Sequence, residues 1–197
     1  MIITSRICII FILASVTANY AQEKNLSVFL LTGSANPSTG GFTVSGSGGT
    51  LGPWKSGFQL TAGIEYPLDK KFSVRGMINY SRHSYDDFST RWLKNNDPVF
   101  SMFDIWGDLK LNIWRFYLHL GAGFSFQNGE AVSIWYEGKR MPMYESPERK
   151  NVLFTGLLGF GVDVKIYSQF SLIAEADILM REYAGASASL GVKYTLE

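Results

Sequence analysis

The central stretch of the chain alternates apolar residues with polar or very small ones along two long segments. From Phe116 to Gln127 every second residue is apolar, and the residues between them are polar or glycine. The segment from Phe103 to Asn112 alternates in the same way, and Ile113 and Trp114 lie between the two segments. A period of two is the pattern of a β-strand with two unlike faces, so the stretch predicts a tight antiparallel hairpin.

The length and the charge of this hairpin narrow the choice of possible folds further. Strands of soluble proteins have about 5–6 residues, whereas a strand that crosses a bilayer at a tilt needs about 9–11. Both segments belong to the longer class, and their charges lie on one face: Asp104, Asp108, Lys110 and His119. A soluble sandwich buries its apolar face, whereas a membrane barrel turns that face toward lipid. The hairpin alone is compatible with both.

The rest of the chain repeats the alternation and favours the membrane barrel. Together with the hairpin, six further segments give eight strands: 25–31, 57–66, 72–81, 152–165, 170–181 and 188–196. The connections are long and short in turn, and the longest holds two segments, 131–136 and 140–144, that are suited to pair with each other. Long loops alternating with tight turns are typical of outer-membrane barrels. We therefore predict an all-β protein, an eight-stranded antiparallel up-and-down transmembrane β-barrel with both termini on the periplasmic side.

The N-terminal segment is predicted to be a signal peptide. An apolar run from Ile7 to Val16 follows Arg6, and small residues come after it. The run is shorter than the roughly 20 residues of a membrane-spanning helix, and its pattern fits a cleaved secretory signal. We expect residues 1–21 to be this signal, with cleavage after Ala18 or Ala21, and residues 22–197 to form the barrel.

Composition excludes two other classes of protein. The one cysteine, Cys8, lies in the predicted signal segment, so no disulfide is expected in the mature chain. Of 18 basic residues one, Arg6, lies in that segment, which leaves 17 basic against 17 acidic residues. A neutral chain lacks the basic surface that a nucleic acid requires, so we expect no nucleic-acid partner.

The ionisable residues on the polar faces are predicted to line the lumen. Eight strands enclose a space just wide enough for side chains, and charges buried there need partners. We therefore expect ion pairs to fill the lumen, with Glu65 beside Arg75. The expected members are Glu65, Arg75, Asp108, Lys110, His119, Asp163, Lys165, Glu175, Asp177, Arg181 and Lys193. A path for protons or ions is the alternative interpretation.

These residues together resemble the small bacterial outer-membrane β-barrel family, which includes barrels of the OmpX kind and the membrane domain of OmpA. The segment Leu190–Leu196 resembles the C-terminal strand that the barrel-assembly machinery recognises. The resemblance implies an outer-membrane location, contact with lipid and lipopolysaccharide, and the assembly machinery as a partner during insertion. It implies neither a cofactor nor an enzymatic activity.

An enzyme and a narrow pore are the alternatives. Some barrels of this size modify lipid A with a His, a Ser and an acid, and here His83 and Ser84 precede Asp86 and Asp87 near the outer end of a strand. Neighbouring residues on a strand point to opposite faces, so His83 and Ser84 meet only if the chain bends. His83 and His119 are far apart in the sequence and give no metal motif. We therefore expect no catalytic, metal or cofactor site.

Aromatic residues in the long connections are candidates for binding a partner at the cell surface. Surface aromatic residues frequently anchor interfaces, and four lie in the connections after residues 81 and 127: Trp92, Trp135, Tyr136 and Tyr144. In the alternative interpretation they pack against each other and extend the rim of the barrel.

Overall fold

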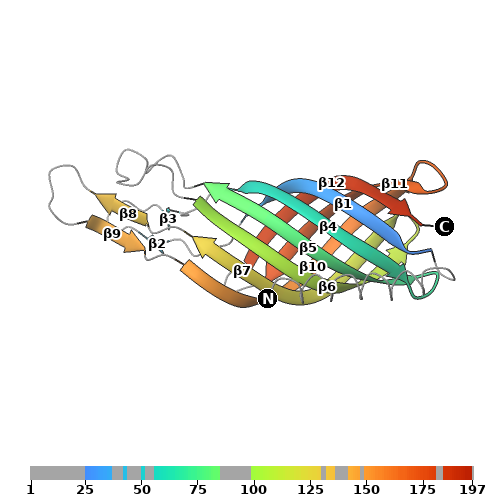
Figure 1. The fold of residues 1–197 in the computed structure, drawn as a ribbon, viewed down its shortest axis with the longest axis horizontal. Helices are drawn as coiled ribbons and strands as arrows, with labels where there is room; N and C mark the ends of the chain where they lie inside the picture. The colour runs from blue at the N-terminus through green and yellow to red at the C-terminus, as the bar shows by residue number, and fades with distance from the viewer. Residues whose placement is uncertain are drawn as a thin grey trace, which may run out of the picture.

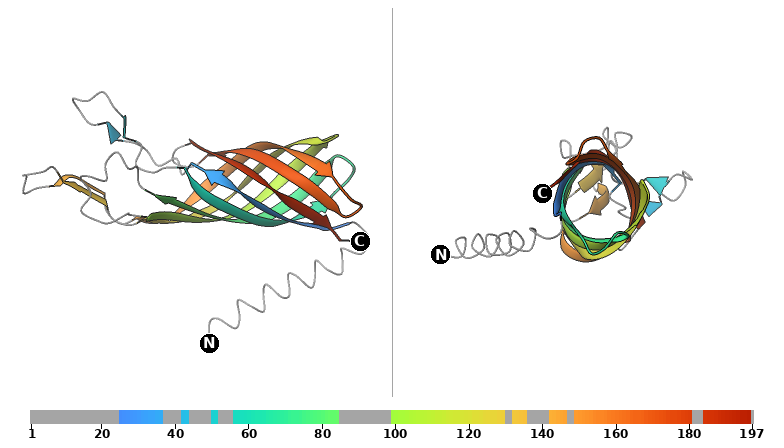
Figure 2. Two further views of the ribbon diagram at one scale, coloured as in Figure 1. Left: turned by 90° about the horizontal axis from the view of Figure 1, so that it is seen from above. Right: turned by 90° about the vertical axis from the view of Figure 1, so that its right-hand side faces the viewer.

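Eight long strands of the protein close into one antiparallel barrel (Figure 1; Figure 2, right). The computed structural model describes residues 25–36, 42–43, 50–51, 56–84, 99–129, 132–135, 142–146, 149–180 and 184–196. The barrel strands are β1 (Ser27–Ala35), β4 (Gly57–Pro67), β5 (Phe72–Ser84), β6 (Val99–Ile113), β7 (Phe116–Gly129), β10 (Arg149–Lys165), β11 (Phe170–Met180) and β12 (Ala184–Thr195). Each strand pairs with its neighbour in the chain, and β1 closes the barrel on β12. The predicted all-β, eight-stranded antiparallel barrel is confirmed.

Two small hairpins complete the described strands. β2 (Phe42–Thr43) pairs with β3 (Thr50–Leu51), and β8 (Val132–Trp135) pairs with β9 (Pro142–Ser146). The pairing predicted between 131–136 and 140–144 is therefore confirmed. Both hairpins lie beyond the same end of the barrel (Figure 1). We call this end the loop end and the opposite one the turn end.

Short connections at the turn end have recognisable local causes. At residues 68–71, Asp69 Oδ1 accepts hydrogen bonds from the backbone N–H groups of Lys71 and Phe72, at 2.6 and 2.7 Å. In the β6–β7 hairpin Trp114 has a φ of 60°, the positive value that tight two-residue hairpin turns require. The turn consists of Trp114 and Arg115, one residue later than predicted.

Several strands extend further toward the loop end than the sequence predicts. β5 continues to Ser84, which pairs with Val99 of β6, and β10 begins at Arg149, which pairs with Gly129 of β7. Pairing of the backbone does not require an apolar face, so the strands continue where the alternation in the sequence has ended. As a result His83 and Ser84 lie on a strand.

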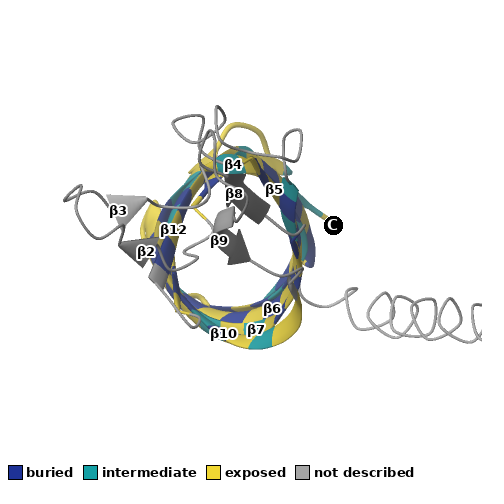
Figure 3. Cartoon of the chain, turned by 90° about the vertical axis from the view of Figure 1, so that its left-hand side faces the viewer, coloured by how far each residue is buried: buried dark blue, intermediate teal, exposed yellow. Residues whose placement is uncertain are grey.

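The outer wall of the barrel is apolar. Among the described residues, 34 large hydrophobic side chains are exposed, against 12 hydrophobic residues that are buried. On the described parts of the eight barrel strands, outward-facing charges occur only near the loop end, at Arg82 and Lys150. This is the reverse of a water-soluble barrel and matches a wall that faces hydrocarbon. Figure 3 shows exposed and buried positions alternating around the wall. None of the described residues forms a helix long and apolar enough to span a membrane.

The interior combines charged residues with an apolar cluster that the sequence did not predict. This cluster consists of Phe29, Leu31, Met77, Trp106, Tyr117, Leu157, Ile173 and Leu179. Inward glycines give the large rings room. A Cβ on Gly63 would lie 2.4 Å from the Phe29 ring, and one on Gly161 would lie 2.2 Å from the Tyr117 ring. The inward glycines therefore complement large side chains from neighbouring strands.

Candidate functional site in the barrel lumen

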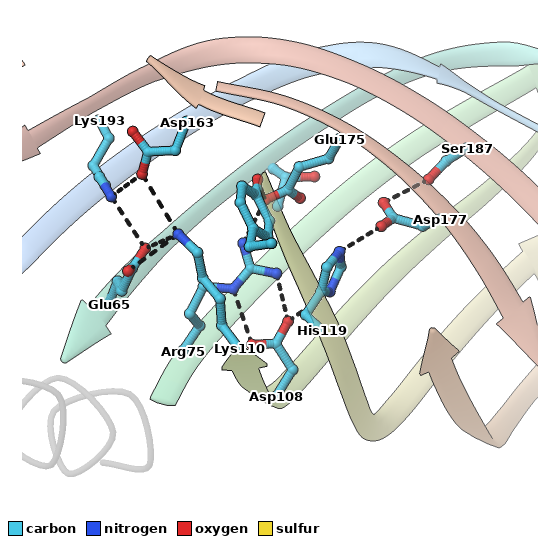
Figure 4. A network of polar contacts seen from close by, with 12 residues as sticks. Glu65, Arg75, Asp108, Lys110, His119, Asp163, Glu175, Asp177, Ser187 and Lys193 are labelled. Carbon is cyan, nitrogen blue, oxygen red and sulfur yellow. Dashed lines mark hydrogen bonds and ion pairs between the residues drawn. The ribbon is translucent and has the colours of Figure 1, made fainter. Parts of the chain in front are cut away.

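A network of charged side chains crosses the lumen (Figure 4). Its members come from seven of the eight barrel strands, because each of them occupies an inward position of the period-two pattern. We call this set the lumen network: Glu65, Arg75, Asp108, Lys110, Tyr117, His119, Asp163, Glu175, Asp177, Ser187 and Lys193.

Arg75 is at the centre of the network and is 1% exposed. Its Nε and Nη2 atoms donate to the two carboxylate oxygens of Asp108, at 2.9 and 2.6 Å. Its Nη1 atom donates to Glu175, which lies on β11 across the lumen. The two-bond contact uses the planar fork of the guanidinium, the geometry in which arginine binds carboxylate most strongly. Arg75 thereby joins β5 to β6 and to β11.

Lys110 organises a second part of the network nearer the turn end. Its Nζ lies 3.1 and 3.0 Å from the two carboxylate oxygens of Glu65, and 3.5 Å from Asp163 Oδ2. Lys193 also pairs with Asp163 and lies 3.6 Å from Glu65. The Lys110 ammonium stands 4.0 Å from the centre of the Tyr117 ring, so it has an aromatic face as well as two carboxylates as partners.

The predicted placement of Glu65 beside Arg75 is confirmed, whereas the predicted ion pair between the two is wrong. Glu65 and Arg75 are direct partners in the β4–β5 register, and Asp108 is the direct partner of Arg75 on the other side, in β6. The guanidinium binds Asp108, whose short side chain holds its carboxylate opposite the fork. The longer Glu65 side chain reaches Lys110 and Lys193 instead.

His119 lies between two carboxylates. Its Nδ1 is 3.0 Å from Asp108 Oδ2, and its Nε2 is 3.0 Å from Asp177 Oδ1. The other oxygen of Asp177 accepts a hydrogen bond from Ser187 Oγ at 3.0 Å. His119, Gly159 and Asp177 occupy one row across β7, β10 and β11, with the glycine in the middle. The missing side chain of Gly159 lets the two flanking side chains meet.

Some residues predicted for the site lie elsewhere. Lys165 is the last residue of β10, and its exposed side chain makes no ion pair with the described residues, because it lies where the barrel meets solvent. Arg181, Trp92 and Tyr136 fall outside the described residues. The backbones of Trp135 and Tyr144 belong to β8 and β9.

His83 and Ser84, the pair considered for an enzyme, point to opposite faces of β5, as the strand geometry predicts. His83 is buried on the inner face with 1% exposure, whereas Ser84 is exposed on the opposite face. The Nε2 atom of His83 instead lies 3.0 Å from the hydroxyl of Ser81. Ser81 is two residues earlier on the same strand face, a spacing that the sequence shows but that our prediction did not use.

Sequence reasoning also missed Tyr117 and a polar ladder nearer the loop end. The Tyr117 hydroxyl donates to Glu175 Oε1 at 2.6 Å. In the ladder, Gln59 donates to Thr61, Thr61 to Asn79, and Asn79 to Asp104, at 3.1, 2.9 and 2.7 Å. Period two places all of these residues inward, but a search confined to charged residues passes over tyrosines, amides and hydroxyls.

The lumen network is built to hold strands together across the barrel. Arg75 and Lys110 are at most 1% exposed and each contacts carboxylates from two other strands. Charges buried in this way are stable only when they are paired, because nothing offsets the desolvation cost of an unpaired buried charge. The arrangement therefore occupies the lumen with mutually dependent side chains.

Comparisons with known proteins agree on the fold. No protein-family model matches the sequence, and a search of curated proteins finds no match. Among solved structures, the attachment invasion locus protein Ail of Yersinia pestis, in complex with the heparin analogue sucrose octasulfate, is 14% identical with a TM-score of 0.51, covering 88% of this chain and 97% of Ail. The outer membrane protein OprG of Pseudomonas aeruginosa is 11% identical with a TM-score of 0.50, covering 88% of this chain and 96% of OprG. The chain therefore has the fold of the small eight-stranded outer-membrane barrels, and the predicted resemblance is confirmed at this level.

Proposed function

We propose that this protein is a non-enzymatic, integral barrel of the bacterial outer membrane that acts through its long connections at the loop end. The observation that carries the proposal is the network of ion pairs inside the barrel. The side chains of Arg75, Lys110 and Tyr117 are almost fully buried and contact partners from across the barrel. Because ion pairs occupy the interior of the barrel, contact with other molecules takes place at its ends.

The two ends of the barrel differ in a way that favours the loop end. The turns at residues 68–71, 114–115 and 166–169 are short, whereas the β8–β9 hairpin extends beyond the loop end as a separate two-stranded sheet (Figure 2, left). Binding residues are frequently carried on connections held by a rigid scaffold. We assign Trp92, Trp135, Tyr136 and Tyr144 to this binding surface.

The apolar wall supports the membrane location. Outer-membrane barrels have short periplasmic turns and longer extracellular loops, so the turn end and both termini face the periplasm in this proposal. The wall then contacts lipid and, in the outer leaflet, lipopolysaccharide. The barrel-assembly machinery acts on the chain during insertion.

The comparison with Ail supports ligand binding at the cell surface as the kind of function that we propose. The solved complex of Ail with sucrose octasulfate shows that a barrel of this fold holds a ligand. The identity of the partner is a separate question, because at 14% identity the likeness concerns the fold.

The proposal is tested by replacing residues 131–148 with a short Gly/Ser turn. The lumen network and the outer wall keep all their residues, so the variant should fold, as checked by circular dichroism and by gel mobility before and after boiling. We expect it to fail to complement the envelope phenotype of a deletion strain. Full complementation by the folded variant would show that this connection is not the functional part.

Two measurements separate the alternative functions. A narrow pore would give steady conductance steps in planar bilayers, and the lumen network predicts none for the wild-type protein. An enzyme acting on lipid A would change the lipid A mass spectrum between wild-type and deletion strains. If that change occurred and His83→Ala abolished it with folding intact, the enzyme would replace the proposal.

A further inference from the structure

We propose that His119, Asp177 and Glu175 form a binding site for one divalent transition-metal ion, of which Zn²⁺ is the type, inside the barrel. The ligand atoms these three residues can offer all lie within 4.8 Å of one another. The residues are 2%, 7% and 6% exposed, respectively. One imidazole nitrogen with carboxylate oxygens is a donor set that zinc accepts, whereas magnesium and calcium prefer oxygen ligands alone.

Two buried atoms of the candidate site lie next to each other without a hydrogen bond. Nε2 of His119 and Oδ1 of Asp177 are buried and 3.0 Å apart, yet neither has a hydrogen-bond partner. A proton on Nε2 would therefore not point at the oxygen. Two ligand atoms of one metal ion have the same arrangement. The ion lies along the lone pair of the nitrogen, and the second ligand atom lies off that axis. With metal–ligand bonds of about 2.0–2.2 Å at the tetrahedral angle, two such ligands are about 3.3–3.6 Å apart. The two atoms, which are 3.0 Å apart, would therefore move slightly apart when the ion binds.

The other nitrogen of the His119 ring contacts a carboxylate. Nδ1 of His119 lies 3.0 Å from Asp108 Oδ2, which Arg75 also holds. Histidines that bind metals commonly donate their second N–H to a carboxylate, which fixes the tautomer and leaves the first nitrogen as the ligand. Glu175 is oriented in a similar way, since its Oε1 accepts from Arg75 and Tyr117. The candidate ligands are thus held in place by groups outside the site.

The charge of the lumen network favours a bound cation. The lumen network contains five carboxylates, from Glu65, Asp108, Asp163, Glu175 and Asp177, and three cationic groups, from Arg75, Lys110 and Lys193. With His119 neutral, the lumen network carries two more negative than positive charges, not counting the buried Asp104 of the polar ladder nearer the loop end. One divalent cation balances this excess of two, whereas a second proton on His119 would balance one.

Gly159 provides the space between the ligands. It is the direct cross-strand partner of both His119 and Asp177. A Cβ on this residue would lie 2.2 Å from Asp177 Oδ1 and 2.4 Å from His119 Nε2. Both atoms therefore converge on the open face of the glycine. An ion bound there would fasten β7 to β11 across β10, a structural role independent of the surface function proposed above.

The test measures retained zinc. The protein is refolded from urea into detergent in the presence of Zn²⁺, dialysed, and analysed for metal content. We expect one equivalent in the wild-type protein. Asp177→Asn, which keeps an oxygen for Ser187, and Gly159→Ala, which keeps every ligand but removes the space, should each weaken Zn²⁺ binding at least tenfold. Circular dichroism and gel mobility confirm that each variant is folded.

The matched control is the other histidine of the barrel. In the strand register His119 lies opposite Lys110, and Lys110 lies opposite Ser73 on β5. His83 therefore lies ten residues farther along β5 than the level of His119. His83→Asn should retain zinc like the wild-type protein. The proposal is overturned if the wild-type protein retains no zinc, if folded Asp177→Asn and Gly159→Ala retain it unchanged, or if His83→Asn loses it.

A measurement on the wild-type protein decides the question if the variants do not fold. Imidazole nitrogen resonances of ¹⁵N-histidine-labelled protein are recorded with and without Zn²⁺. The proposal expects the His119 signals to move and those of His83 to stay. Retained zinc with unmoved His119 signals would overturn the site, as would retention of Ca²⁺ in preference to Zn²⁺ in a parallel refolding.

Discussion

Arg75 shows at the scale of single residues what holds the barrel together. One guanidinium binds Asp108 through two hydrogen bonds and Glu175 through a third. The attraction among the three charged groups therefore offsets the cost of removing each of them from water, so each group depends on the other two. A side chain of this kind is far more sensitive to removal than an apolar side chain on the outer wall.

We expect Arg75→Ala to destabilise the folded barrel by roughly 3–5 kcal/mol, the cost of leaving buried charges without a partner. The measurement is urea unfolding in detergent, followed by the loss of strand signal in circular dichroism. The control is Ile78→Ala on the same strand, whose side chain is 50% exposed on the outer wall and should cost clearly less. Equal unfolding midpoints for Arg75→Ala and the wild-type protein would contradict the buried network.

The sequence predicts which side chains face inward but not which ones pair. Period two assigns Glu65, Arg75 and Asp108 to the lumen without any structure. The choice between Glu65 and Asp108 as the partner of Arg75 depends on side-chain length and on the register of three strands, and both acids are direct neighbours of the arginine. Contacts across the lumen, such as the bond from Arg75 to Glu175, depend on barrel closure, which local patterns do not encode.

At the scale of elements, the β6–β7 hairpin was predictable because its alternation is long and uninterrupted. Its paired region, from Phe100 opposite Gly129 to Ile113 opposite Phe116, extends past the apolar alternation at the loop end. The predicted boundary of β6 was too short there because the inward residues Phe100 and Met102 are apolar, so the alternation of apolar and polar residues is lost. The alternation of apolar and polar residues therefore marks the part of a strand that separates lipid from lumen. The remaining residues of the strand are defined only by backbone pairing with the neighbouring strand.

Two glycines of this hairpin offer a test of how closely its strands pack. A Cβ on Gly123 would lie 2.0 Å from the backbone oxygen of Ile105 and 2.6 Å from the Trp106 ring, whereas one on Gly107 would meet its nearest atom at 3.8 Å. We expect Gly123→Ala to destabilise the barrel by about 1–3 kcal/mol, as overpacking typically does. Gly107→Ala is the matched control and should unfold near the wild-type urea concentration. A smaller effect at Gly123 than at Gly107 would show that the inner wall has more room than the packing indicates.

At the scale of the whole molecule, the distribution of apolar surface is inverted relative to a soluble protein. Large hydrophobic side chains cover the outside, while the lumen holds the charges. Closure of β1 on β12 leaves no barrel strand with an unpaired edge, which matters because unpaired backbone groups are very costly in hydrocarbon. Fold class was therefore predictable from pattern alone. The interior apolar cluster was not, because its members occupy inward positions, where the alternation predicts polar or small residues.

This inversion predicts how the purified protein behaves. In detergent it should give a circular dichroism spectrum dominated by β-strand. Its electrophoretic mobility should shift on boiling, because the closed barrel resists unfolding by detergent at room temperature and loses its compact shape on heating. Transfer to detergent-free buffer should cause aggregation, since 34 large apolar side chains would then face water. The hairpin replacement at 131–148 should show the same three properties, because it leaves the wall intact. A helix-rich spectrum, or a stable monomer without detergent, would contradict the membrane barrel, since either requires an outer surface different from the one these strands present.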